Sequence, residues 1–124
     1  MRGADVAAKN RRGATPLHYA ADANRYAPEA QAATVFVLLK AGAIVDAPDK
    51  SGVTALHRAV RTRAVAAVRM LLAGGADPNL KNGSGSTPLF LADRTTGRGG
   101  SGTPEAKATQ GEIIEMLRAA GALA

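Results

Sequence analysis

Few side chains in this sequence of 124 residues could act as catalytic acids, bases or nucleophiles. His18 and His57 are its two histidines, and it contains no cysteine. Thiol catalysis and thiolate zinc sites are therefore excluded. The histidines are not accompanied by a HExxH pattern, a Ser-His-acid constellation or paired carboxylates at helical spacing. The sequence predicts no enzyme, no cofactor and no metal site.

Cationic side chains are the second group of residues that could carry a function, here the binding of anions. Lys and Arg number 16 against 10 Asp and Glu, which gives a net charge of +6 at pH 7. A guanidinium can bind a carboxylate or a phosphate through two parallel hydrogen bonds. A positive field also speeds association with acidic molecules. The charge therefore favours acidic partners, although it does not indicate a fold.

The glycine-rich segment 97–102, which reads Gly-Arg-Gly-Gly-Ser-Gly, has two interpretations. Gly and Ser favour a flexible linker between two helices. Alternatively, glycine N–H groups could converge on a phosphate or carboxylate beside basic residues. The residues of this hypothetical anion site are Arg63, Arg98, Gly99, Gly100 and Ser101. The GxxxxGK[ST] pattern is absent, so nucleotide hydrolysis is not implied.

The elements that must position these side chains recur along the chain. TPLHYA begins at Thr15, TALHRA at Thr54 and TPLFLA at Thr87, and the last two lie 33 positions apart. A second block begins at Leu38 as LLKAGA, at Leu71 as LLAGGA and later as LRAAGA. The spacing indicates a period of 33 residues, with insertions of 6 residues in the first unit and 13 in the third.

Each unit carries two short amphipathic helices, because apolar residues recur at positions i, i+3 and i+4, as in Leu56, Ala59 and Val60. A threonine precedes each first helix as an N-cap, and a glycine follows each second helix as a C-cap. Between units, Asn or Asp is followed by Gly three positions later, which is typical of a turn. We therefore predict a helix, a second helix and a projecting turn in each unit.

These motifs resemble the ankyrin-repeat family over essentially the whole chain. The Thr-Pro-Leu-His-x-Ala signature is complete at 15–20, lacks Pro at Ala55 and has Phe90 in place of His. The resemblance implies an all-α solenoid of three helix-turn-helix repeats with projecting β-hairpin-like turns and inter-helix insertions in repeats 1 and 3. It also implies a concave face that binds proteins, no catalysis, and histidines that hydrogen-bond the backbone near the hairpins.

We predict a single ankyrin-repeat domain over residues 1–124. Its parts are the finger of a preceding repeat (1–12), repeat 1 with its insertion (13–45), repeat 2 (46–78), and repeat 3 with an insertion at 94–112 and a C-terminal cap (79–124). Both insertions contain proline followed by glutamate, at Pro28 and Pro104, so both second helices are expected to start early.

The two ends of the predicted stack differ. Asp93 and Arg118 stand where earlier units have apolar residues, so we expect both to face solvent, to close the array and to pair with each other. The first unit shows no such change. Either the chain is a fragment of a longer array, or this face of repeat 1 is covered by a partner or by self-association with a second copy.

Several cations occupy the positions where this family places variable concave residues. The candidates for partner binding are Arg11, Arg12, Tyr19, Lys50, Arg58, Arg61 and Arg94. They favour a non-enzymatic module that binds an acidic protein or peptide. A merely solvated charged face, anion binding at 97–102 and nucleic-acid binding are the alternatives. Nucleic-acid binding is disfavoured because the sequence lacks aromatic stacking platforms and a recognition-helix motif.

No membrane partner is expected, because no stretch approaches the roughly 20 apolar residues of a membrane span. Residues 1–10 lack the apolar core of a secretory signal. We therefore predict a cytoplasmic protein, and the Ala, Gly and Arg usage suggests a bacterial source.

Overall fold

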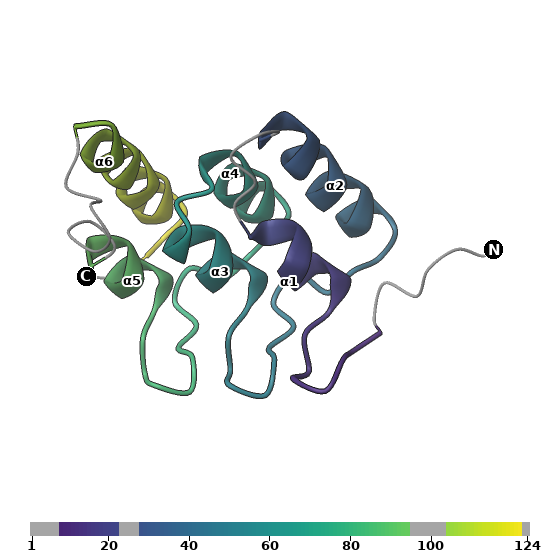
Figure 1. Ribbon diagram of the computed structural model, residues 1–124. Coiled ribbons are helices and arrows are strands. Elements are labelled where there is room, and N and C mark those ends of the chain that lie inside the picture. The colour runs from purple at the N-terminus through teal and green to yellow at the C-terminus, as the bar shows by residue number, and fades with distance from the viewer. Residues whose placement is uncertain (1–7, 23–27, 95–103, 123–124) are drawn as a thin grey trace.

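The computed structural model describes residues 8–22, 28–94 and 104–122. Helices in these ranges are α1 (Pro16–Ala21), α2 (Pro28–Lys40), α3 (Ala55–Arg61), α4 (Val65–Ala73), α5 (Pro88–Arg94) and α6 (Pro104–Ala119). They pair in chain order and stack side by side, with α1, α3 and α5 in one layer and α2, α4 and α6 in the other (Figure 1). The predicted all-α fold is confirmed for the described residues. None of the described helices has the length and apolar character needed to cross a membrane.

The first helix of each pair begins at the predicted threonine. The Thr54 hydroxyl accepts a hydrogen bond from the His57 backbone N–H at 3.3 Å, and the Thr54 N–H donates to His57 Nδ1 at 3.1 Å. This is a capping box in which a histidine ring replaces the usual Glu or Gln. At the third threonine, the Phe90 N–H donates to the Thr87 hydroxyl at 3.2 Å. The threonine caps at Thr54 and Thr87 were therefore predicted correctly.

The helices of the second layer differ in length. α2 and α6 span 13 and 16 residues, whereas α4 spans 9. Both long helices begin at a proline followed by a glutamate, as predicted. The segments that precede them, 23–27 and 95–103, lie outside the described residues.

Projecting turns hang from one edge of the stack (Figure 1). In each turn the side-chain oxygen of Asn10, Asp49 or Asn82 accepts two backbone N–H groups, at 2.8–3.0 Å. Neighbouring turns are joined by backbone hydrogen bonds, from Lys50 N–H to Arg12 C=O at 2.8 Å and from Gly83 N–H to Ser51 C=O at 2.6 Å. The turns therefore form a continuous row. Within the described ranges they contain no β-strand.

Two glycines allow the cost of close turn-to-turn packing to be measured. Gly52 and Gly75 both have left-handed φ angles, of 74° and 96°. A Cβ at Gly52 would lie 2.8 Å from the Gly83 nitrogen, whereas a Cβ at Gly75 would meet nothing within 4 Å. Gly75→Ala is expected to cost about 1 kcal/mol from backbone strain, and Gly52→Ala roughly twice that because a neighbouring turn must also shift. Urea unfolding of both variants checks this; equal losses would contradict the packing argument.

The core lies between the two layers and consists of small and aliphatic side chains. Leu56, Val60, Val68 and Leu71 are fully buried in the middle of the stack. Alanines pack among them and let the helices approach closely. By contrast, the aromatic side chains of the described residues are exposed, Tyr19, Phe36 and Phe90 being about half exposed.

The two ends of the stack expose different surfaces. At the first end, the Val37 side chain on α2 is 61% exposed, and Leu38 is only half-buried although its counterpart Leu71 is fully buried. At the other end, Asp93 and Arg118 are exposed, as expected. The expected pairing is not found, since the ion pairs within the described part of the chain do not include these two residues. Coverage of the first end by a preceding repeat, a partner or a second copy stays a prediction.

Candidate functional site

Six of the seven predicted partner-binding residues line a single groove of about 770 Å³. Two successive projecting turns and the helices α1 and α3 form it. We call it the basic groove; its lining residues are Arg11, Arg12, Tyr19, Asp22, Asp49, Lys50, Ser51, Val53, Arg58 and Arg61. The seventh candidate, Arg94, ends α5, and its side chain lies outside the described part of the structure.

The basic groove is lined by more cationic than acidic side chains. Five cationic side chains face two carboxylates, Asp22 and Asp49, so positive charge is in excess by three. Arg11, Arg12, Lys50 and Arg61 are exposed. These four cations are therefore available to a molecule that enters the groove, and their mutual repulsion falls when an anion binds between them.

Arg58 lines the basic groove but is not a free cation. Its Nη1 donates to Asp22 Oδ2 at 3.2 Å, and its Nη2 lies 3.8 Å from Asp49 Oδ2. Its guanidinium carbon lies 5.3 Å from the centre of the Tyr19 ring, within range of a cation–π interaction. The side chain is only 12% exposed. Arg58 therefore differs from the surrounding cations, because its charge is already balanced within the chain.

The two carboxylates of the groove were missed as site residues. Asp49 was predicted only as a turn residue, and its Oδ1 does accept the Ser51 and Val53 N–H groups. Its second oxygen is the one that faces Arg58. Asp22 follows α1 directly, as its C-cap residue, and was assigned no role. A sequence signal existed for Asp49, since the other two turns have Asn at this position and need no charge there.

His18 and His57 connect successive units, as the resemblance implied. His18 Nε2 lies 2.7 Å from the Val53 carbonyl oxygen, and His57 Nε2 lies 3.0 Å from that of Ser86. In each ring, Nδ1 accepts a threonine N–H, so Nε2 carries the proton and donates it to the next turn. Burial lowers the pKa of both imidazoles, only partly offset by these backbone hydrogen bonds. Both rings therefore join the N-cap of their own helix to the backbone of the next turn.

The hypothetical anion site falls mostly outside the described residues. Arg98, Gly99, Gly100 and Ser101 belong to the segment 95–103. Arg63 lies in the tight turn between α3 and α4 with a left-handed φ of 58°. Within the ranges that the structure does describe, no group of three or more His, Asp or Glu side chains could hold a metal ion.

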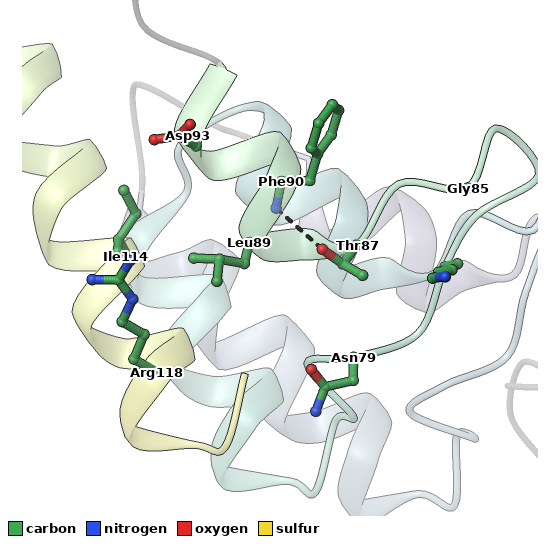
Figure 2. A pocket seen from close by; sticks show the side chains of 9 residues that line it. Asn79, Gly85, Thr87, Leu89, Phe90, Asp93, Ile114 and Arg118 are labelled. Atoms are coloured by element: carbon green, nitrogen blue, oxygen red, sulfur yellow. Dashed lines mark hydrogen bonds between the residues drawn. The ribbon is translucent and has the colours of Figure 1, made fainter. Parts of the chain in front are cut away.

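A second hollow, of about 530 Å³, lies at the exposed face of the last helix pair (Figure 2). Its floor is apolar, with Leu89 on α5 and Ile114 on α6. Figure 2 shows Asp93 and Arg118 at separate places on its rim, which explains why they do not pair. Where a further unit would stack, the surface therefore carries a carboxylate and a guanidinium of opposite charge.

Comparisons with known proteins agree with the repeated architecture. A family model described as "Ankyrin repeats (many copies)" matches residues 38–92, and one described as "Ankyrin repeat" matches residues 12–50. The matched residues together exceed half of the chain. They include α1 to α4 and all but two residues of α5.

Several curated proteins are similar in sequence. SH3 and multiple ankyrin repeat domains protein 2 of Homo sapiens is 38% identical over 78 residues, which are 63% of this chain and 4% of that protein. B-cell lymphoma 3 protein homolog of Mus musculus is 39% identical over 92 residues, 73% of this chain and 19% of that protein. The chain thus spans less than a fifth of either relative's length. These matches, to animal proteins, do not support the predicted bacterial source.

Proposed function

We propose, from the premise that this chain belongs to the ankyrin-repeat family, that it is a non-enzymatic module binding an acidic protein or peptide through the basic groove. Ankyrin repeats bind other proteins and are typically not catalytic. The acidic nature of the partner and the place where it binds are the specific parts of the proposal.

One observation carries the proposal: four exposed cations, Arg11, Arg12, Lys50 and Arg61, line the same groove. Two of them stand on successive turns that are joined through the Lys50 N–H and the Arg12 C=O at 2.8 Å. The cations are therefore held on a rigid frame, so little backbone entropy is lost when a ligand binds. An extended acidic segment lying along the groove would neutralise several of them at once.

Three repeats are part of this proposal. Each helix pair is preceded by a turn with the same pair of side-chain hydrogen bonds, at Asn10, Asp49 and Asn82. This equivalence supports second and third repeats that begin near residues 46 and 79, three positions before their turn residues, whereas the same offset from Asn10 favours a first repeat that begins near residue 7 and not at the predicted residue 13. It also supports insertions confined to the first and third units, ahead of the longer helices α2 and α6.

Charge reversal in the groove tests the proposal. In the double variant Arg12→Glu, Arg61→Glu, affinity for a fluorescein-labelled octaglutamate peptide is expected to fall by on the order of tenfold or more, because attraction becomes repulsion. Fluorescence anisotropy gives the dissociation constant. The matched control is Lys40→Glu, Lys107→Glu, which changes the net charge equally on the exposed surfaces of α2 and α6.

Equal losses in the groove variant and in the control would argue against a site in the groove. Single-stranded oligothymidylate serves as a second probe in the same titration. Tighter binding of this probe than of the peptide, falling steeply with salt, would favour the nucleic-acid alternative.

A further inference from the structure

We infer that Asp22 competes with the acidic ligand for Arg58. The Asp22 carboxylate binds the Arg58 guanidinium and must be displaced before an acidic group of the ligand can bind there. The inference rests on the proposed function and names the residue that limits the affinity of the basic groove. The exposed cations would then attract the ligand, and the exchange at Arg58 would set how tightly it is held.

The contact between Asp22 and Arg58 is an incomplete version of a strong pairing. A carboxylate and a guanidinium bind most tightly through two parallel hydrogen bonds. Here one hydrogen bond forms, from Nη1 to Oδ2. Within the part of the chain that the structure describes, the buried Asp22 Oδ1 and Arg58 Nε atoms have no hydrogen-bond partner. Because buried polar atoms without partners are costly, this pair is weaker than a complete fork and can be replaced by a better one.

The two members of the pair are held unequally. The Asp22 side chain is 37% exposed and follows the last residue of α1, so it recovers water readily when it leaves. Arg58 lies within α3, is far less exposed and contacts the Tyr19 ring. Exchange at this site therefore moves the aspartate and leaves the arginine in place.

Asp49 is not the competitor, although it also lies near Arg58. Its Oδ1 is held by the Ser51 and Val53 N–H groups, and its side chain is 9% exposed. Its Oδ2 lies 3.8 Å from Nη2, beyond hydrogen-bonding distance. Asp49 thus orients the Arg58 guanidinium from the turn, whereas Asp22, at the end of α1, forms the hydrogen bond that a ligand must replace.

A ligand that replaces Asp22 must bind the groove more strongly than the single hydrogen bond by which Asp22 holds Arg58. A protein segment with adjacent acidic side chains meets this requirement, because one carboxylate can bind Arg58 through both oxygens while its neighbours bind the exposed cations. We therefore expect the basic groove to select clustered acidic residues over isolated ones.

The test is a double-mutant cycle with the octaglutamate peptide and the full chain. Asp22→Asn is expected to tighten binding about tenfold, equivalent to about 1.4 kcal/mol, because an uncharged amide competes less for the guanidinium. Asp77→Asn makes the same change of net charge on an exposed residue outside the groove and is expected to leave affinity nearly unchanged. In an Arg58→Gln background, the gain from Asp22→Asn is expected to disappear.

The outcomes separate the inference from the proposed function. If the wild-type chain binds the peptide and Asp22→Asn binds it equally or less well, Asp22 is not a competitor and the proposed function stands. A gain that persists in the Arg58→Gln background would also overturn the inference, since it would reflect the general field of the groove. If neither the wild type nor Asp22→Asn binds the peptide, the proposed function fails and the inference fails with it.

A second measurement does not depend on any variant remaining folded. In the wild-type chain, the NMR signal of the Arg58 Nε–H group is expected to shift when the peptide saturates the groove, because a new acceptor reaches the guanidinium. The corresponding signal of Arg69, an exposed residue of α4 paired with Glu112, serves as the control. Saturation without a shift at Arg58 would refute the exchange.

Discussion

Leu71→Ala is expected to lower the free energy of unfolding by about 2–5 kcal/mol, as is typical of leucine truncation in a packed core. Leu71 is fully buried in α4, the middle helix of its layer. The helices on both sides of α4 pack against it, so the cavity cannot collapse from one side alone. A loss of this size is a large part of the stability of a small domain. Urea unfolding followed by circular dichroism measures it.

The matched control for this prediction is Leu38→Ala. Leu38 holds the equivalent place in the first unit, where no described element covers it, and it is only half-buried. We expect a loss clearly smaller than that of Leu71→Ala, because less apolar surface leaves water at this position on folding. Equal losses that depend on protein concentration would contradict an uncovered face and would indicate a second copy packed on it.

Acidification is expected to destabilise the fold between about pH 7 and pH 5, above the range in which most carboxylates titrate. Burial lowers the pKa of His18 and His57 in the folded chain from the usual 6.5. Below that value the unfolded chain binds protons that the folded chain does not. Stability is therefore fully present above about pH 6.5 and falls with pH, by at most roughly 1.4 kcal/mol per pH unit for each histidine. Urea unfolding at a series of pH values gives this slope.

The variant His57→Gln tests whether the histidines cause the change of the unfolding free energy with pH. Its stability at neutral pH is expected to be lower, because the hydrogen bond to the Ser86 carbonyl is lost or weakened. Its pH dependence is expected to be about half that of the wild type, because only His18 remains to titrate. An unchanged slope in this variant would show that other groups cause the acid sensitivity.

Most of the repeated architecture could be predicted because its determinants are local. The threonine caps, the Asn and Asp turns and the early starts of α2 and α6 depend on contacts between residues close in sequence. Arg11, Arg12, Lys50 and Arg61, which line one groove, were chosen from the resemblance to the ankyrin-repeat family, because they hold positions where that family places variable concave residues. The expected pairing of Asp93 and Arg118 was wrong because their side chains lie at separate places on the rim of the second hollow.

The ion pairing of Arg58 could not be predicted in the same way. Its partner Asp22 lies 36 positions earlier, just beyond the end of α1, and nothing in the repeat pattern assigns it a role. Whether a cation on a concave face is free or paired depends on side-chain contacts between units, and these form only when the helices stack. Local sequence therefore determined the helices, the turns and the face on which the cations lie, through short-range hydrogen bonds and apolar periodicity. The packing of α1 against α3 decided which of those cations is already neutralised, because that contact brings distant charges within a few ångströms of one another.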